Sequence, residues 1–323
     1  MSDRLLSIAR NTFVETIRQP IYGVLVSVTA LLLILNIFLA GFTLQDDDKL
    51  LMDLGLSTIL LSGLFLSAFS ATGVLTREIE NKTAMTILSK PVTRTVFILG
   101  KYLGLMAAQC AAFYVSFLIF ILCMHHRVMQ YATDPFDWPA ILLGGGSGLL
   151  AIVLAALANY FYGKEFCSTA VALILPLLTL GTVATCFFDR DLERSLFLQQ
   201  MFKGGQLFFA VILIMTAVLL ITAIALAAST RLGQVMTLMT CAVAMMIGFL
   251  SDWFLGQHQG DSALAFILYR AIPNVNFFWV VDAVTAGNVV PVGYVIRAVV
   301  YAMLFVIAIL LIGVALFQRR EVG

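Results

Sequence analysis

Eight runs of about 20 apolar residues, each free of charged side chains, dominate this sequence. They cover residues 21–42, 54–75, 102–124, 139–162, 166–187, 207–228, 234–251 and 298–317. A helix of about 20 residues crosses the roughly 30 Å hydrocarbon core of a bilayer, and it pairs its backbone polar groups within itself. The seventh run reaches this length if its helix continues through Phe254. The pattern therefore predicts an all-α integral membrane protein with about eight transmembrane helices.

The charges of the connecting loops predict how these spans are oriented, because cytoplasmic loops carry an excess of Lys and Arg. With the N-terminus placed in the cytoplasm, the inner segments hold twelve of the 19 Lys and Arg residues and six of the 18 Asp and Glu residues. The inner side is then net positive and the outer side net negative. We expect a multi-pass protein of the cell (inner) membrane with both termini in the cytoplasm.

Residues 1–20 predict a separate amphipathic helix ahead of the first span. Apolar side chains recur at helical spacing, and the polar ones fall largely on other faces. Such a helix lies on the membrane surface, and Pro20 ends it so that the chain can turn into the first span. The apolar residues are Leu5, Ala9, Phe13 and Ile17.

The segment 256–291 is the longest connection on the outer side. Its stretches SALAFILYRAI and NFFWVVDAV are apolar, but each is too short to cross a membrane. We expect both to form short helices that pack against the outer leaflet or dip into it. No repeat and no stretch of the size of a soluble domain is present, so we expect one transmembrane domain over 1–323.

The spans lack the features of several transport classes. None has an ionisable residue in its middle, where proton-coupled carriers place such residues. The sequence has no GxxxxGK[ST] phosphate-binding loop, and its GGGSG cluster at 144–148 fits close helix packing instead. The five cysteines have no paired short spacing and indicate neither disulfides nor a zinc site. The energy for any transport is therefore expected to come from outside this chain.

Four side chains of the outer side are the candidates for catalysis or metal binding. They are His125, His126, Asp134 and Asp137. Their spacing matches no common metal-ligand pattern. We expect no catalytic residue, no bound metal and no cofactor in this chain, and we keep a membrane-embedded lipid-modifying enzyme as an alternative.

An inner segment, 76–101, concentrates charge: seven charged residues lie in it. Ala84, Ile87 and Leu88 share one face of a short helix, and Lys90 lies near the helix's negative end, which favours a cation. Pro91 stops this helix, and Thr93 is placed to cap the next one. The segment predicts a short helix across the cytoplasmic membrane surface, with a mixed apolar and charged face for a protein partner.

The stretch REIENKTAMTILSKPVTRTVFILGKYLG resembles the coupling loop of ATP-binding cassette (ABC) transporter permeases of the second exporter type, the ABC-2-type membrane subunits. The segment ending in Arg18-Gln19-Pro20 resembles the connecting helix of these permeases, and the turn STRLG at 229–233 and the ending FQRREVG are similar to theirs. Many members have six spans, whereas eight runs are counted here. The matching residues of the loop are Arg77, Glu78, Glu80, Thr83, Leu88, Ser89, Lys90, Pro91, Val92, Thr93, Arg94, Gly100 and Lys101.

The resemblance implies the permease subunit of an ATP-driven exporter. A separate cytoplasmic ABC ATPase subunit would use ATP and Mg, and a second permease chain, identical or different, would complete the pathway within membrane lipid. No nucleic acid is implied. The implied ATPase interface is Arg77, Glu78, Glu80, Thr83, Ala84, Ile87, Leu88, Lys90, Pro91 and Arg94. The implied anchors of the connecting helix are Arg4, Arg10, Glu15 and Arg18.

The residues leave two matters open. A gradient-driven secondary transporter or channel remains the alternative to the ATP-driven exporter, and it would work without an ATPase. No residue pattern in the spans indicates a substrate, so the substrate-binding residues stay unassigned.

Overall fold

The computed structural model of the chain describes residues 2–41, 47–80, 93–129, 136–190, 193–195, 197, 205–258 and 263–318. For residues 2, 76–80, 258 and 263–265 it describes the backbone alone. Within these ranges the regular structure is helical, apart from one isolated bridge between Phe188 and Arg194. The predicted all-α fold is confirmed.

Eight helices in the described ranges are long and apolar enough to cross a membrane, one for each apolar run. The seventh, α10, continues through Asp252 to Phe254, as its length required. They are α2 (Pro20–Ala40), α3 (Asp47–Glu80), α5 (Arg94–His126), α6 (Gly146–Tyr162) with the π-helical turn η1 (Ala140–Gly145) before it, α7 (Phe166–Thr185), α9 (Gln206–Ser229), α10 (Gln234–Phe254) and α13 (Val292–Gln318).

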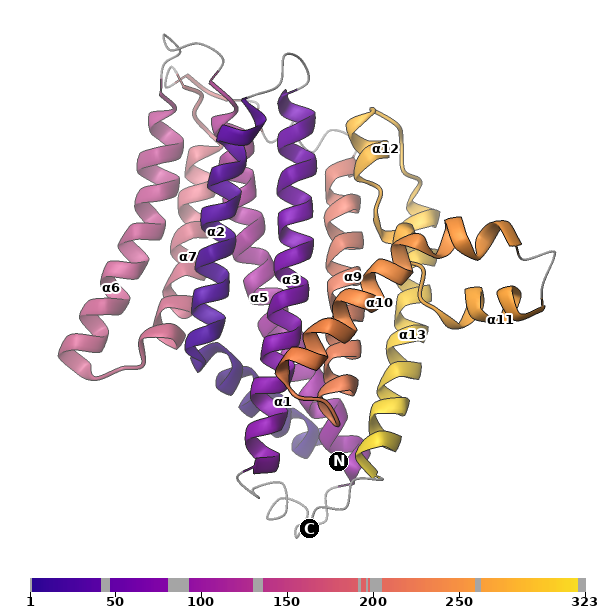
Figure 1. The fold of residues 1–323 in the computed structure, drawn as a ribbon. Helices are drawn as coiled ribbons and strands as arrows, with labels where there is room; N and C mark the ends of the chain where they lie inside the picture. The colour runs from indigo at the N-terminus through magenta and orange to yellow at the C-terminus, as the bar shows by residue number, and fades with distance from the viewer. Residues whose placement is uncertain are drawn as a thin grey trace.

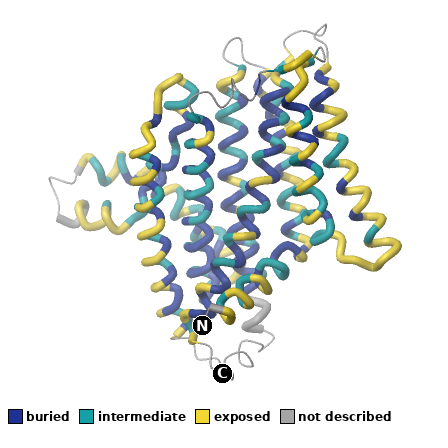
Figure 2. Tube along the Cα trace, turned by 180° about the vertical axis from the view of Figure 1, so that it is seen from behind, coloured by how far each residue is buried: buried dark blue, intermediate teal, exposed yellow. Residues whose placement is uncertain are grey.

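The spans form a bundle with three central helices and five peripheral ones (Figures 1 and 2). Within the chain, 67% of the spanning stretch of α3, 67% of that of α5 and 61% of that of α9 is buried, against 22–28% for the other five. The peripheral helices therefore turn much of their apolar surface outward, which suits lipid or another chain as the surrounding medium.

Helix α1 (Ser2–Arg18) lies obliquely across one end of the bundle, and the last described residues of α13 lie at the same end (Figure 1). We call this the α1 end. Gln19 is extended (φ −68°, ψ 129°), and Pro20 is the first residue of α2. The predicted break at Pro20 is confirmed, because a proline fits the first turn of a helix but not its interior.

The predicted close packing at GGGSG is confirmed at Gly144, whereas Gly148 makes an ordinary contact. A Cβ atom on Gly144 would overlap the Leu122 side chain of α5, so η1 lies close to that helix at this residue. The hairpin of α6 and α7 lies at the side of the bundle (Figure 1).

The connection from α10 to α13 contains four short elements. They are η3 (Gly256–His258), α11 (Ala263–Ala271), η4 (Val275–Phe278) and α12 (Val281–Thr285). Within SALAFILYRAI, Ala263–Ala271 form the predicted helix α11, which projects from the side of the bundle (Figure 1). NFFWVVDAV is also helical, but in two pieces, η4 and α12. Trp279 separates them (φ −96°, ψ 90°), and its ring packs edge-on against Phe249.

A polar cluster holds this connection on α10. One oxygen of Asp252 accepts hydrogen bonds from the Tyr269 hydroxyl and from the Asn274 side-chain amide, both at 2.7 Å. The Asn276 amide donates to the Phe249 carbonyl at 2.7 Å. The hydrogen bond to Asp252, with burial adding to it, raises the pKa of the Tyr269 phenol. Asp252 therefore organises the connection after α10.

Candidate functional site

Most of the residues that the resemblance assigns to an ATPase interface lie outside the described residues. This holds for Thr83, Ala84, Ile87, Leu88, Lys90 and Pro91. Arg77, Glu78 and Glu80 form the last turn of α3, of which the backbone alone is described. Arg94, the first residue of α5, is the member whose side-chain contact the structure gives.

The described ends of this segment fix where it attaches. Glu80 ends α3 at the α1 end, and Thr93 precedes α5 at the same end (Figure 1). The Thr93 hydroxyl accepts a hydrogen bond from the Val96 N–H at 3.5 Å, which confirms the predicted helix cap. The charged segment therefore joins two of the three central helices of the bundle.

The first turn of α5 contacts the last turn of α13. An Nη atom of Arg94 donates a hydrogen bond to the Gln318 carbonyl at 2.7 Å. The Phe97 and Phe317 rings stack with their centroids 5.6 Å apart. From the turn between α9 and α10, Nε of Arg231 donates to the Leu316 carbonyl at 3.0 Å.

A buried cation lies one turn further along α5. Lys101 is 3% exposed, and its Nζ atom lies 3.6 Å from a Glu15 carboxylate oxygen of α1. Nζ also lies 5.6 Å from the centroid of the Phe97 ring, within cation–π range. Because a buried charge is costly unless it is compensated, this contact fastens α1 to α5.

Two glycines of α5 let α1 come close. A Cβ atom on Gly104 would lie 2.5 Å from the Ala9 carbonyl oxygen and from the Thr12 side chain. A Cβ atom on Gly100 would lie 2.7 Å from Ile8. Thr12, Thr16 and Ile17 are buried, whereas Leu6 is 71% exposed. The amphipathic helix thus uses part of its surface to pack on α5.

The other predicted anchors of α1 have different environments. Arg18 pairs with Glu165 before α7 at 3.6 Å, but both side chains are more than half exposed, and exposed pairs contribute little. Arg4 and Arg10 are exposed. Glu15, by contrast, meets the buried Lys101.

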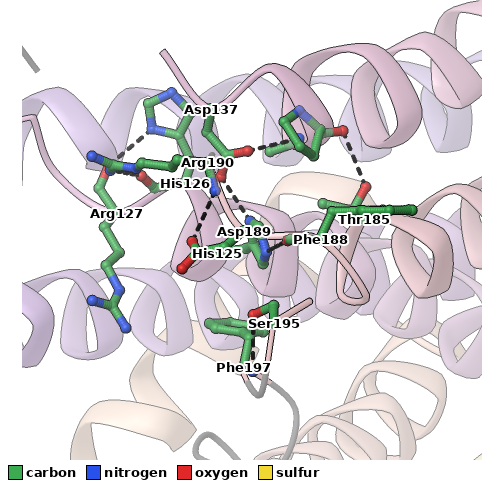
Figure 3. Close-up of polar contacts among 12 residues, drawn as sticks. His125, His126, Arg127, Asp137, Thr185, Phe188, Asp189, Arg190, Ser195 and Phe197 are labelled. Atoms are coloured by element: carbon green, nitrogen blue, oxygen red, sulfur yellow. Dashed lines mark hydrogen bonds and ion pairs between the residues drawn. The ribbon is translucent and has the colours of Figure 1, made fainter. Parts of the chain in front are cut away.

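Three of the four histidine and aspartate candidates, His125, His126 and Asp137, lie near one another (Figure 3), at the end of the bundle opposite α1 (Figure 1). His125 Nε2 donates to the Phe188 carbonyl at 3.0 Å, and Nδ1 lies 2.7 Å from an Asp137 carboxylate oxygen. The other Asp137 oxygen accepts from the Ala140 N–H at 3.0 Å. Burial alone would raise the pKa of Asp137, but these hydrogen bonds and the neighbouring histidine charges hold that pKa below its usual range.

This cluster joins loops rather than forming an open site. An Nη atom of Arg190 donates to the His126 carbonyl, and the Phe197 ring lies edge-on to His125 with centroids 4.8 Å apart. Asp137 is fully buried and His125 is 5% exposed. Asp134 lies outside the described residues, and among those described no three His, Cys, Asp or Glu side chains could hold a metal ion together. The geometry suits a structural contact that holds these loops together.

A small cavity lies between α2, α3 and α5. Its volume is about 10 Å³, which is room for about one water molecule. Gln109, 3% exposed, donates to the Gly63 carbonyl at 3.3 Å beside it. The cavity is too small for an organic cargo molecule, so it does not assign the substrate-binding residues.

Sequence reasoning missed the contacts of α13 with Arg94, Phe97 and Arg231. They join residues far apart in the chain, and no local pattern indicates them. A signal for the α1 contact was present: Gly100 and Gly104 are four residues apart, the spacing of close helix pairs.

Comparison with known protein families identifies a match. The family model described as "ABC-2 family transporter protein" matches residues 25–232, more than half of the chain. The matched range runs from α2 to the turn after α9 and includes the charged segment. No curated protein matches the chain.

Proposed function

Because the chain belongs to the ABC-2 family of transporter proteins, we propose that it is the permease subunit of an ATP-driven exporter. A separate cytoplasmic ABC ATPase docks under the charged segment and drives it. The chain is the membrane-spanning subunit, with no catalytic residue of its own, and ATP and Mg are used by the ATPase.

One observation carries this proposal: the charged segment joins α3 to α5 at the α1 end. Both helices belong to the buried centre of the bundle. A force applied to the segment therefore acts on the centre of the bundle and not on a peripheral helix. This attachment supports coupling of the central helices to a separate ATPase.

The mechanism follows from that attachment. ATP binding closes two ATPase subunits against each other. This closure pushes the segment 81–92 against the ends of α3 and α5. The central helices tilt, and cargo leaves from the cytoplasm or the inner leaflet. Glu78 and Glu80, at the end of α3, contact the ATPase directly, and the apolar residues Ala84, Ile87 and Leu88 occupy its groove.

A second permease chain and the lipid share the outward-facing apolar surface. Large exposed side chains on α6 and α13, such as Leu149, Leu154, Leu304 and Leu311, supply such surface. The chain lies in the cell (inner) membrane with its α1 end on the cytoplasmic side, in accord with the positive charge of the loops at that end. A second copy and a different permease are equally compatible with this surface.

Affinity purification of the tagged chain in mild detergent tests the proposal. We expect an ABC ATPase to be recovered with the native chain and to be lost, by tenfold or more, with the double variant Glu78→Lys, Glu80→Lys. The matched control is Asp189→Lys with Glu193→Lys, two exposed acidic residues at the opposite end, which leaves the recovery unchanged.

The opposite result is equally informative. If no ATPase is recovered with the native chain under conditions that keep other ABC complexes intact, the exporter proposal fails. The gradient-driven transporter then becomes the better explanation, and transport by the purified chain without ATP is its positive test.

A further inference from the structure

The last described turn of α13 is held by three other parts of the chain. Its consecutive residues Leu316, Phe317 and Gln318 all make contacts outside α13. The partners are Arg231 from the α9–α10 turn, and Phe97 and Arg94 from the first turn of α5.

The two arginine contacts have a common physical basis. The last carbonyl groups of a helix lack partners within the helix, and they carry the negative end of its dipole. Each guanidinium donates to one such carbonyl, at 2.7 Å for Arg94 and at 3.0 Å for Arg231. Two cations from different elements therefore hold one helix end.

An aromatic contact adds to the two arginine contacts. Phe97 is 3% exposed and Phe317 is 2% exposed, so their stacked rings form a buried contact between α5 and α13. Lys101 lies over the same Phe97 ring and reaches Glu15 of α1. The first turns of α5 thus contact α13 on one side and α1 on another.

We propose that Arg94 is a positioning residue that fastens the end of α13 to α5, while Arg231 fastens the same end to the α9–α10 turn, so that α13 moves when the charged segment moves α5. That an ATPase moves the charged segment rests on the proposed function. In the family resemblance Arg94 belongs to the ATPase interface; its bond to Gln318 gives it a partner within this chain instead.

The fastening is tested on the chain alone, without an ATPase. Spin labels are attached to Leu99→Cys on α5 and Ala315→Cys on α13, both exposed positions, after the five native cysteines are replaced by alanine. Pulsed electron spin resonance in detergent measures the distance distribution between them. We expect Arg94→Ala and Arg231→Ala each to broaden it at least twofold, and Arg94→Lys to leave it narrow, because lysine also donates to a carbonyl.

The matched control is Arg297→Ala, an exposed arginine near the other end of α13, which leaves the distribution unchanged. If both Arg94→Ala and Arg231→Ala leave the distribution as narrow as in the unsubstituted chain, the fastening is absent and the inference is wrong. This outcome is independent of whether an ATPase associates with the chain.

The transmission step is tested on the complex with the ATPase. The labels are then at Ala315→Cys and at Leu149→Cys on the peripheral helix α6, and ATP with Mg and vanadate is the probe. We expect the nucleotide to shift the distance, and Arg231→Ala to reduce the shift by half or more with unchanged ATPase recovery. A full shift in the Arg231→Ala variant, together with loss of the ATPase in Arg94→Ala, would overturn the inference and return Arg94 to the ATPase interface.

Discussion

At the scale of the residue, Lys101 shows how a charge near the start of an apolar run is accommodated. Such a lysine ordinarily reaches water with its ammonium group. Here the side chain is 3% exposed and lies against Glu15 and the Phe97 ring. In the sequence Lys101 marks the boundary of a span. In the structure it forms a contact between α1 and α5.

The first prediction concerns this pair. Glu15→Gln removes a carboxylate beside a buried ammonium, whereas Lys101→Met removes the charge itself and keeps an aliphatic side chain. We expect Glu15→Gln to be the more destabilising change, by about 1–3 kcal/mol, because an uncompensated buried charge costs more than a lost pair. Thermal unfolding in detergent micelles measures the difference.

The exposed pair between Arg18 and Glu165 supplies the control. Glu165→Gln is expected to change stability by no more than about 0.5 kcal/mol, because water screens exposed pairs. A larger loss of stability for Lys101→Met than for Glu15→Gln would contradict the burial argument.

The second prediction concerns Asp137, whose pKa lies below its usual range. A carboxylate with a lowered folded-state pKa stabilises the protein above its unfolded-state pKa of about 4, and this contribution is lost as pH falls through the folded value. We expect the native chain to be more stable than Asp137→Asn at pH 7, and the difference to shrink below about pH 4. Unfolding temperatures of both chains between pH 7 and pH 3 provide the test.

Asp189→Asn, which changes an exposed carboxylate, should give little difference at any pH in that range. A stability difference between the native chain and Asp137→Asn that grows on acidification would show that the His125–Asp137 contact is not that of an ionised carboxylate.

At the scale of the element, the contact of α1 with α5 depends on small residues. Gly100 and Gly104 give α5 a face without side chains, and α1 lies directly on it. An amphipathic helix that lay on the membrane surface alone would not need this face. The charged segment and α1 thus both act on the first turns of α5.

The third prediction tests this packing. Gly104→Ala would bring a Cβ atom to 2.5 Å from the backbone oxygen of Ala9, and the backbone of α1 has to move to make room. We expect a loss of about 1–3 kcal/mol in stability, as is typical of overpacking, and faster protease cleavage within α1. Gly146→Ala is the control, because nothing lies within 4 Å of its Cβ position.

At the scale of the whole molecule, the bundle separates two chemically different ends. The α1 end holds the basic residues Arg94, Lys101 and Arg231, while the opposite end holds the contact between His125 and Asp137. The orientation of these ends in the membrane stays a prediction from loop charge.

The fourth prediction concerns that orientation. In intact cells, a membrane-impermeant maleimide should label Asn288→Cys, an exposed residue in the turn before α13, and should not label Ser7→Cys on α1 until the cells are permeabilised. The native chain, whose five cysteines are buried or partly buried, measures the background. Labelling of Ser7→Cys, but not of Asn288→Cys, in intact cells would reverse the topology.

The sequence by itself determined the properties that depend on neighbouring residues. Eight runs of apolar side chains predicted eight spanning helices, because the cost of placing a backbone in hydrocarbon is set by length and composition. Pro20 and Thr93 predicted helix boundaries that are confirmed. The charged segment supported a family resemblance that the match over residues 25–232 bears out.

Only the tertiary structure decided which helices are central and which contacts join their ends. Arg94 and Gln318 are 224 residues apart, and no local pattern predicts that a guanidinium will meet the end of a distant helix. The NFFWVVDAV stretch is interrupted at Trp279, whose ring packs on Phe249 of another helix. Hydropathy acts on each segment separately, whereas such contacts depend on how the segments pack together.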